Sequence, residues 1–113
     1  MDLVVGDVWF AKFPLEENPS ESINRPVVVL DIDTMEVLSV KVTKTAPRNT
    51  DEFDLPIVYW EEANLRFKST ARVAKTVTLP KSAFINRIGT LHPDDLTDIQ
   101  TKFMEYIDSL DDI

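Results

Sequence analysis

Arg25 and Thr43 are the two residues whose types and positions best suit phosphate chemistry. Arg25 directly precedes a proline at the start of an apolar run, and a guanidinium there can pair bidentately with a phosphate or a carboxylate. Thr43 lies among Lys41, Lys44 and Thr45, so hydroxyl and ammonium groups are interleaved along one short segment. This pattern predicts an oxyanion or phosphate pocket. The alternative is a surface arginine beside threonines that merely favour β-structure.

Few other residues support catalysis or cofactor binding. The chain has no cysteine, which excludes disulfides, thiolate ligands and a cysteine nucleophile. Its single histidine, His92, has no HExxH-type companion, so we expect it to cap or pack a helix start rather than to bind a metal. Asp31 and Asp33 share a strand face but lack a third ligand. We therefore predict neither a metal nor another cofactor.

Glycine content excludes two large classes of enzyme. The chain has only 2 glycines, which leaves no room for a GxxxxGK[ST] or GxGxxG phosphate loop. ATPases and dinucleotide-dependent enzymes are therefore excluded.

Charge is distributed unevenly along the chain. The net charge is −8, which argues against general binding of nucleic acid. Residues 39–92, however, carry 9 basic and 5 acidic side chains, whereas residues 1–38 and 93–113 are each strongly acidic. A basic centre between two acidic ends can attract a polyanion locally while the whole molecule stays soluble. The alternative is a solvated surface on which basic residues cluster by chance.

The chain length of 113 residues predicts one domain, spanning residues 1–113. The longest apolar runs are far too short to cross a bilayer, and the amino terminus lacks a basic segment followed by an apolar stretch. We therefore expect a cytoplasmic protein without membrane contact.

Hydrophobic patterning predicts a mainly β protein. Leu38, Val40 and Val42 alternate with polar residues, so one strand face enters a core and Thr43 looks outward. Antiparallel pairing of this strand with the preceding one would bring Arg25 near Thr43. The strands are expected at residues 8–13, 27–32, 38–45, 55–60, 71–79 and 84–91, with one helical turn at 81–83.

One helix is expected after these strands. Proline and two aspartates follow His92, as suits the first turn of a helix. An apolar stripe then runs from Leu96 to Leu110 at helical spacing. Several short strands followed by one carboxy-terminal amphipathic helix predict an α+β fold, a small curved antiparallel barrel capped by that helix.

The order of these features resembles a known family, the MazF/PemK toxins of bacterial type II toxin-antitoxin systems. The likeness spans residues 5–110 and is carried by four segments in a fixed order. These are Gly6-Asp7-Val8-Trp9, Asn24-Arg25-Pro26-Val27, Val40-Lys41-Val42-Thr43 and Ile88-Gly89-Thr90-Leu91, with Ser69 to Val77 before the last.

The resemblance implies a homodimer of SH3-like barrels that cleaves single-stranded RNA at short sequences, without a metal. It also implies a cognate antitoxin protein as partner. Arg25 and Thr43 would act at the scissile phosphate, where the adjacent ribose 2′-hydroxyl attacks and leaves a 2′,3′-cyclic phosphate and a 5′-hydroxyl. RNA-binding residues would be Lys41, Lys44, Thr45 and Arg72, with Trp60, Tyr59 or Phe67 stacking bases.

Two features leave a second function open, namely the acidic net charge of −8 and the lack of one acid that some relatives carry. Some relatives carry an acid two residues after the arginine of the fifth strand, whereas Arg72 is followed here by Val73 and Ala74. The alternative is a CcdB-like toxin that binds DNA gyrase, or a decayed relative that only binds a partner. For Trp60 the alternative is packing in the core or at a dimer interface.

Overall fold

A computed structural model describes residues 2–111 and shows six strands, one short 3-10 helix and one α-helix. The strands are β1 (Asp7–Pro14), β2 (Ser22–Ile32), β3 (Glu36–Thr43), β4 (Asp54–Pro56), β5 (Thr70–Pro80) and β6 (Phe84–Thr90). The 3-10 helix η1 (Lys81–Ala83) joins β5 to β6, and α1 (Pro93–Leu110) ends the chain.

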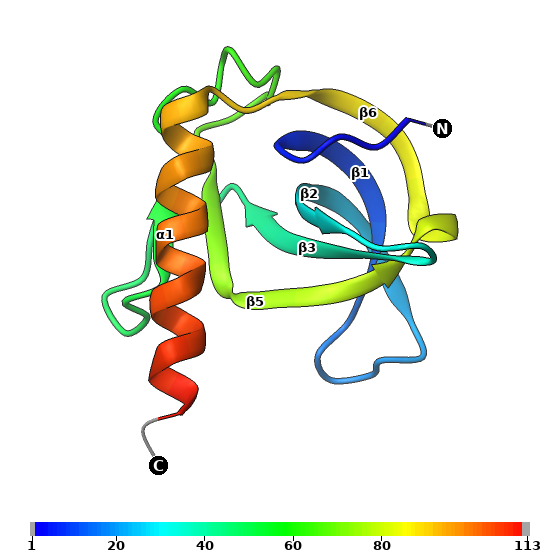
Figure 1. The fold of residues 1–113 in the computed structure, drawn as a ribbon, viewed down its shortest axis with the longest axis horizontal. Coiled ribbons are helices and arrows are strands. Elements are labelled where there is room, and N and C mark those ends of the chain that lie inside the picture. Colours follow the sequence, from blue (N-terminus) through cyan, green and yellow to red (C-terminus); the bar gives the residue numbers. More distant parts are fainter. Residues whose placement is uncertain (1, 112–113) are drawn as a thin grey trace.

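The strands form one antiparallel sheet in the order β4-β5-β3-β2-β1-β6. Figure 1 shows the sheet curling into an open barrel, with the long strand β5 on one side and β6 on the other. The two edge strands of the sheet, β4 and β6, do not pair with each other within residues 2–111, so the barrel is open. The predicted α+β class, a curved antiparallel barrel with a carboxy-terminal helix, is confirmed.

Strand β2 lies inside the sheet and is covered on both faces. Its residues Val27 to Leu30 are all buried, which explains the unbroken apolar run in the sequence. Val28 and Leu30 belong to a core cluster that also contains Ile99 of α1. Val27 and Val29 belong to a second cluster, which includes Phe13 and other side chains of β1, β5 and η1. The two clusters fix β2 and β3 between them.

Helix α1 stands along one side of the sheet, beside β5 (Figure 1). The side chain of His92 caps it, because Nδ1 accepts the backbone N–H of Asp94 at 3.0 Å, as predicted. Ile99 is 1% exposed, whereas Leu110, the end of the predicted apolar stripe, is 50% exposed. Within residues 2–111 no helix has both the length and the apolar character needed to cross a bilayer.

The predicted strand at residues 55–60 is wrong beyond Pro56. Strand β4 ends at Pro56, and the chain then forms turns up to Asn64. The buried carboxylate of Asp95 in α1 accepts the backbone N–H groups of Val58 and Tyr59, at 3.0 and 2.8 Å. These donors therefore bond to the helix and are lost to the sheet. Similarly, β3 ends at Thr43 rather than at residue 45.

Candidate active site

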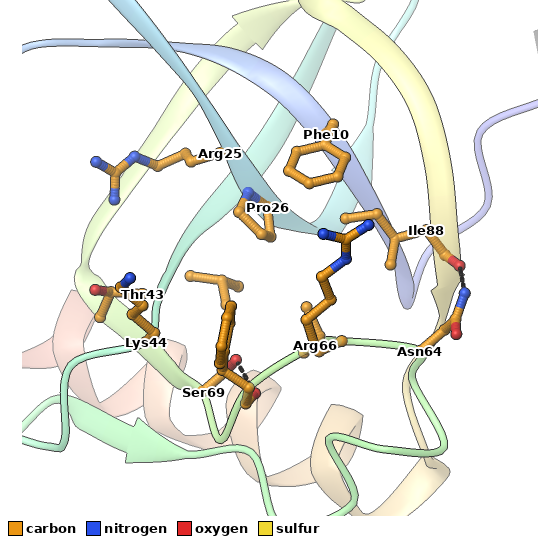
Figure 2. Close-up of a pocket in the computed structure, with 12 residues that line it drawn as sticks. Phe10, Arg25, Pro26, Thr43, Lys44, Asn64, Arg66, Ser69 and Ile88 are labelled. Carbon is orange, nitrogen blue, oxygen red and sulfur yellow. Dashed lines mark hydrogen bonds between the residues drawn. The ribbon is translucent and has the colours of Figure 1, made fainter.

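Arg25 and Thr43 lie on neighbouring strands at the mouth of one cavity. Val27 of β2 faces Lys41 of β3, and the same antiparallel register continued by two residues sets Arg25 across from Thr43. Both residues line a cavity of about 330 Å³. In Figure 2 they lie together at one side of it. The sequence-based expectation that pairing of these strands would bring the two residues together therefore agrees with the structure.

Arg25 is half-buried and presents a free donor. Its Nε atom is buried and has no hydrogen-bond partner among the described residues. The guanidinium carbon lies 5.7 Å from the centroid of the Phe13 ring, a cation-π distance. Burial lowers the pKa of Arg25, and the nearby Glu16 carboxylate partly offsets this. A guanidinium stays charged in proteins, so the side chain offers an anion a fixed cation.

The hydroxyl of Thr43 is held by its neighbours. It lies 3.3 Å from the hydroxyl of Thr45, and the Thr45 backbone N–H donates to its oxygen at 3.3 Å. Thr45 is fixed in turn, because the hydroxyl of Thr70 in β5 donates to its carbonyl oxygen at 2.7 Å. Thr45 therefore positions Thr43. The sequence led us to expect that Thr45 would contact RNA instead.

Lys41 of β3 places a second positive charge beside Arg25. Its ammonium nitrogen lies 5.9 Å from the Phe13 ring centroid, so the two cations share one aromatic ring. Burial lowers the pKa of Lys41, and the positive charge of Arg25 lowers it further. An anion bound between them would relieve this repulsion.

Glu16 is the acidic residue whose negative charge raises the pKa of both Arg25 and Lys41. Its carboxylate forms an ion pair with Lys75 at 3.0 Å, and the hydrogen bond and charge of Lys75 lower the pKa of Glu16. More than half of the Glu16 side chain is exposed. Since its charge is already matched by Lys75, it leaves Arg25 and Lys41 free to meet an anion.

The cavity itself lies between the strands and the segment that precedes β5. Phe10, Pro26 and Ile88 line one side, and residues 64–67 line the other (Figure 2). Lys44 lies at the rim with its ammonium 5.3 Å from the ring centroid of Phe67. The cavity therefore combines apolar walls with cationic groups, as ligand sites commonly do.

The structure gives Arg72 partners other than RNA. Its Nε donates to Asp54 and its Nη2 to Asp51, both at 3.0 Å, and only 11% of the side chain is exposed. Asp54 also accepts the backbone N–H of Arg48. Arg72 does not line the cavity, so we remove it from the expected RNA contacts. It ties the loop before β4 to β5.

Trp60 also lies away from the cavity. It is half-buried and packs against the core cluster that contains Ile99. Part of its surface lines a neighbouring cavity of about 450 Å³, together with Lys44 and Lys68. Its packing in the core favours the alternative that the sequence left open.

Arg66 is a site residue that sequence reasoning did not select. Its guanidinium extends across the cavity toward Phe10 and Pro26 (Figure 2). The available signal was the basic-aromatic-basic run Arg66-Phe67-Lys68, which is too short to be distinctive.

Within residues 2–111 no three His, Cys, Asp or Glu side chains come together as metal ligands.

Comparison with known proteins identifies the sequence family. Residues 5–107 match the family model described as the PemK-like, MazF-like toxin of type II toxin-antitoxin systems. No curated protein matches the sequence significantly.

Several solved structures share the fold. A MazF from Deinococcus radiodurans is 18% identical with a TM-score of 0.70, over 95% of this chain and 99% of that one. A mycobacterial endoribonuclease in complex with its cognate antitoxin is 15% identical with a TM-score of 0.73, over 95% and 96%. The Mycobacterium tuberculosis toxin MazF-mt6 is 18% identical with a TM-score of 0.67, over 90% and 96%. At these identities the likeness establishes the fold.

Proposed function

Because the chain belongs to the PemK-like, MazF-like toxins of type II toxin-antitoxin systems, we propose that it is an endoribonuclease that cleaves single-stranded RNA at the cavity beside Arg25 and Thr43. Two solved structures of the same fold carry the name endoribonuclease, which supports this activity. Neither the family match nor these structures support the CcdB-like alternative.

The buried, unpartnered Nε of Arg25 carries the proposal. An N–H group that has lost its contact with water and gained no acceptor is costly, and a phosphate oxygen would supply the acceptor. The Thr43 hydroxyl lines the same cavity and is already oriented by Thr45. That both side chains line one cavity from adjacent strands supports the proposal that one phosphate binds between them.

The proposed reaction is an internal phosphoryl transfer. The ribose 2′-oxygen forms a bond to the adjacent phosphorus, and the bond from phosphorus to the 5′-oxygen breaks. The 2′-hydroxyl loses its proton to solvent and the 5′-oxygen takes one up, which leaves a 2′,3′-cyclic phosphate and a 5′-hydroxyl. Arg25 and Thr43 stabilise the negative charge that grows on the phosphorane oxygens, and Lys41 and Lys44 hold flanking phosphates.

The family membership also supports two partners. We propose that the protein acts in the cytoplasm as a homodimer and is inhibited by a cognate antitoxin, as the antitoxin complex of the mycobacterial endoribonuclease suggests. An acidic antitoxin segment would compete with RNA for the same cations.

The test is cleavage of a long single-stranded RNA by the purified protein in EDTA. We expect fragments whose 5′ ends accept labelled phosphate directly from polynucleotide kinase, which shows free 5′-hydroxyls. Arg25→Ala and Thr43→Val should each reduce the rate by roughly 100-fold or more. Lys102→Ala removes a cation on α1 and should cleave normally.

Intact RNA with the wild-type protein, under conditions where its circular dichroism shows a folded chain, would refute the proposed activity. Fragments with 5′-phosphate ends would refute the proposed chemistry.

A further inference from the structure

We propose that the cavity beside Arg25 and Thr43 binds one nucleobase of the RNA and that Arg66 makes it selective for guanine, an inference that rests on the proposed RNA cleavage. The cavity volume of about 330 Å³ falls in the range of small-molecule sites. Because the catalytic pair lines the same cavity, the base it holds belongs to a nucleotide that flanks the scissile phosphate.

Two aromatic rings in the cavity wall remain partly open to solvent. Phe10 of β1 is 38% exposed and Phe67 is 57% exposed. Exposed rings at a cationic groove are the usual stacking platforms for unpaired bases. The ammonium of Lys44 beside the Phe67 ring lies where it can also meet the phosphate of a stacked nucleotide.

Three of the six polar side chains that line the cavity are cations whose donors have no partner within residues 2–111, and these are Arg25, Lys44 and Arg66. Within residues 2–111, neither Arg66 nor Lys44 forms a hydrogen bond or an ion pair. The Asn64 amide nitrogen is engaged, since it donates to the Ile88 carbonyl at 2.9 Å, and the Ser69 hydroxyl donates to the Phe67 carbonyl. A base that presents acceptors is therefore the best match.

Guanine is the base that satisfies a guanidinium fork. It offers O6 and N7 side by side, and arginine donates to both. Adenine places an amino group beside N7, so that edge would oppose the guanidinium with its own hydrogens. In single-stranded RNA these edges are free to be read. Figure 2 shows the Arg66 side chain extending past Ile88 toward Phe10, among the residues that line the cavity.

The first experiment sequences the 5′ ends of fragments from a random single-stranded RNA pool. We expect guanine to be enriched at one fixed position within two nucleotides of the cut. Arg66→Ala should lower cleavage of guanine-containing RNA by roughly tenfold and erase the enrichment. Arg66→Gln should shift the preference toward adenine, because glutamine pairs with N6 and N7 of adenine. Lys102→Ala should keep the wild-type preference.

Cleavage without a fixed guanine, or with the same guanine preference in Arg66→Ala, would overturn the inference and leave the nuclease proposal standing. If the wild-type protein cleaves no RNA, the guanine preference is tested by measuring the binding of short oligomers. Short single-stranded DNA lacks the 2′-hydroxyl nucleophile, and fluorescence anisotropy would compare oligomers that differ only by guanine or adenine at one position. Tighter binding of guanine that disappears in Arg66→Ala supports the inference, and equal binding refutes it.

Discussion

Replacing Arg72 by alanine would leave the Asp54 carboxylate buried without the guanidinium at its Oδ1 atom. The Asp54 side chain has no solvent exposure, and the lost hydrogen bond is 3.0 Å long. Removing one partner of a buried ion pair costs about 3–5 kcal/mol. Arg48 still donates to Oδ2 through its backbone N–H, so we expect the lower end, about 3 kcal/mol. At about 4 °C per kcal/mol, the Tm falls by roughly 12 °C.

The same ion pair should make this loss depend on pH. Burial raises the pKa of Asp54, but the backbone N–H of Arg48 and the guanidinium of Arg72 outweigh it and hold the pKa below its ordinary value of 3.8. A carboxylate with a depressed pKa stabilises the fold above that ordinary value, and the contribution disappears as the pH falls through the folded value. The variant should therefore differ most from the wild type at neutral pH, and the gap should narrow below about pH 3.8.

The assay is urea denaturation followed by circular dichroism at pH 7 and pH 3, at one fixed protein concentration. Lys102→Ala is the control, because Lys102 pairs with Glu105 on the exposed surface of α1 and its loss should cost under about 0.5 kcal/mol. If Arg72→Ala costs no more than Lys102→Ala, or costs the same at both pH values, the structural role assigned to Arg72 is refuted.

Three further substitutions test other parts of the molecule. Asp95→Ala removes the acceptor of two backbone N–H groups and should cost about 3 kcal/mol in denaturation, whereas the exposed Asp98→Ala should cost almost nothing. Gly89→Ala should cost about 2 kcal/mol or more in the same assay, because the new Cβ would overlap the Ala63 carbonyl oxygen. Lys44→Ala should weaken RNA binding and reduce the slope of log affinity against log salt by about 0.7, measured by anisotropy in a KCl series.

Much of the fold follows from local patterns in the sequence. The apolar run of β2 is buried as predicted, whereas the alternation in β3 holds only from Val40 to Thr43. Ser39 is fully buried and Leu38 only partly, because the pairing of β3 with β5 shifts register after Ser39. The His92 cap and the proline after it define the helix start. The failure at residues 57–60 has a tertiary cause, because Asp95, far along the chain, takes the N–H groups that a strand would need. No local pattern encodes such a partner.

The site residues, like the fold, were only partly predictable from the sequence. Arg25 and Thr43 could be placed together because strand pairing fixes which residues face one another. Arg72 could not be separated from the RNA-binding cations, because its type and strand position are the same whether it meets a phosphate or a buried aspartate. Arg66 lies in a segment without periodicity, and only the packing of that segment against β1 and β2 brings it into the cavity.

The basic centre seen in the sequence contains fewer available cations than its composition suggests. Arg48 and Arg72 are matched by Asp51 and Asp54, Lys75 by Glu16, and Arg87 by Asp7. Four cations in or beside the cavity have no carboxylate partner within residues 2–111, and these are Arg25, Lys41, Lys44 and Arg66. The molecule extends 37 Å along its longest axis, while charges at physiological salt are screened beyond about 8 Å. RNA at the cavity therefore senses these four cations far more than the acidic surface of α1, so a chain of net charge −8 can bind a polyanion locally.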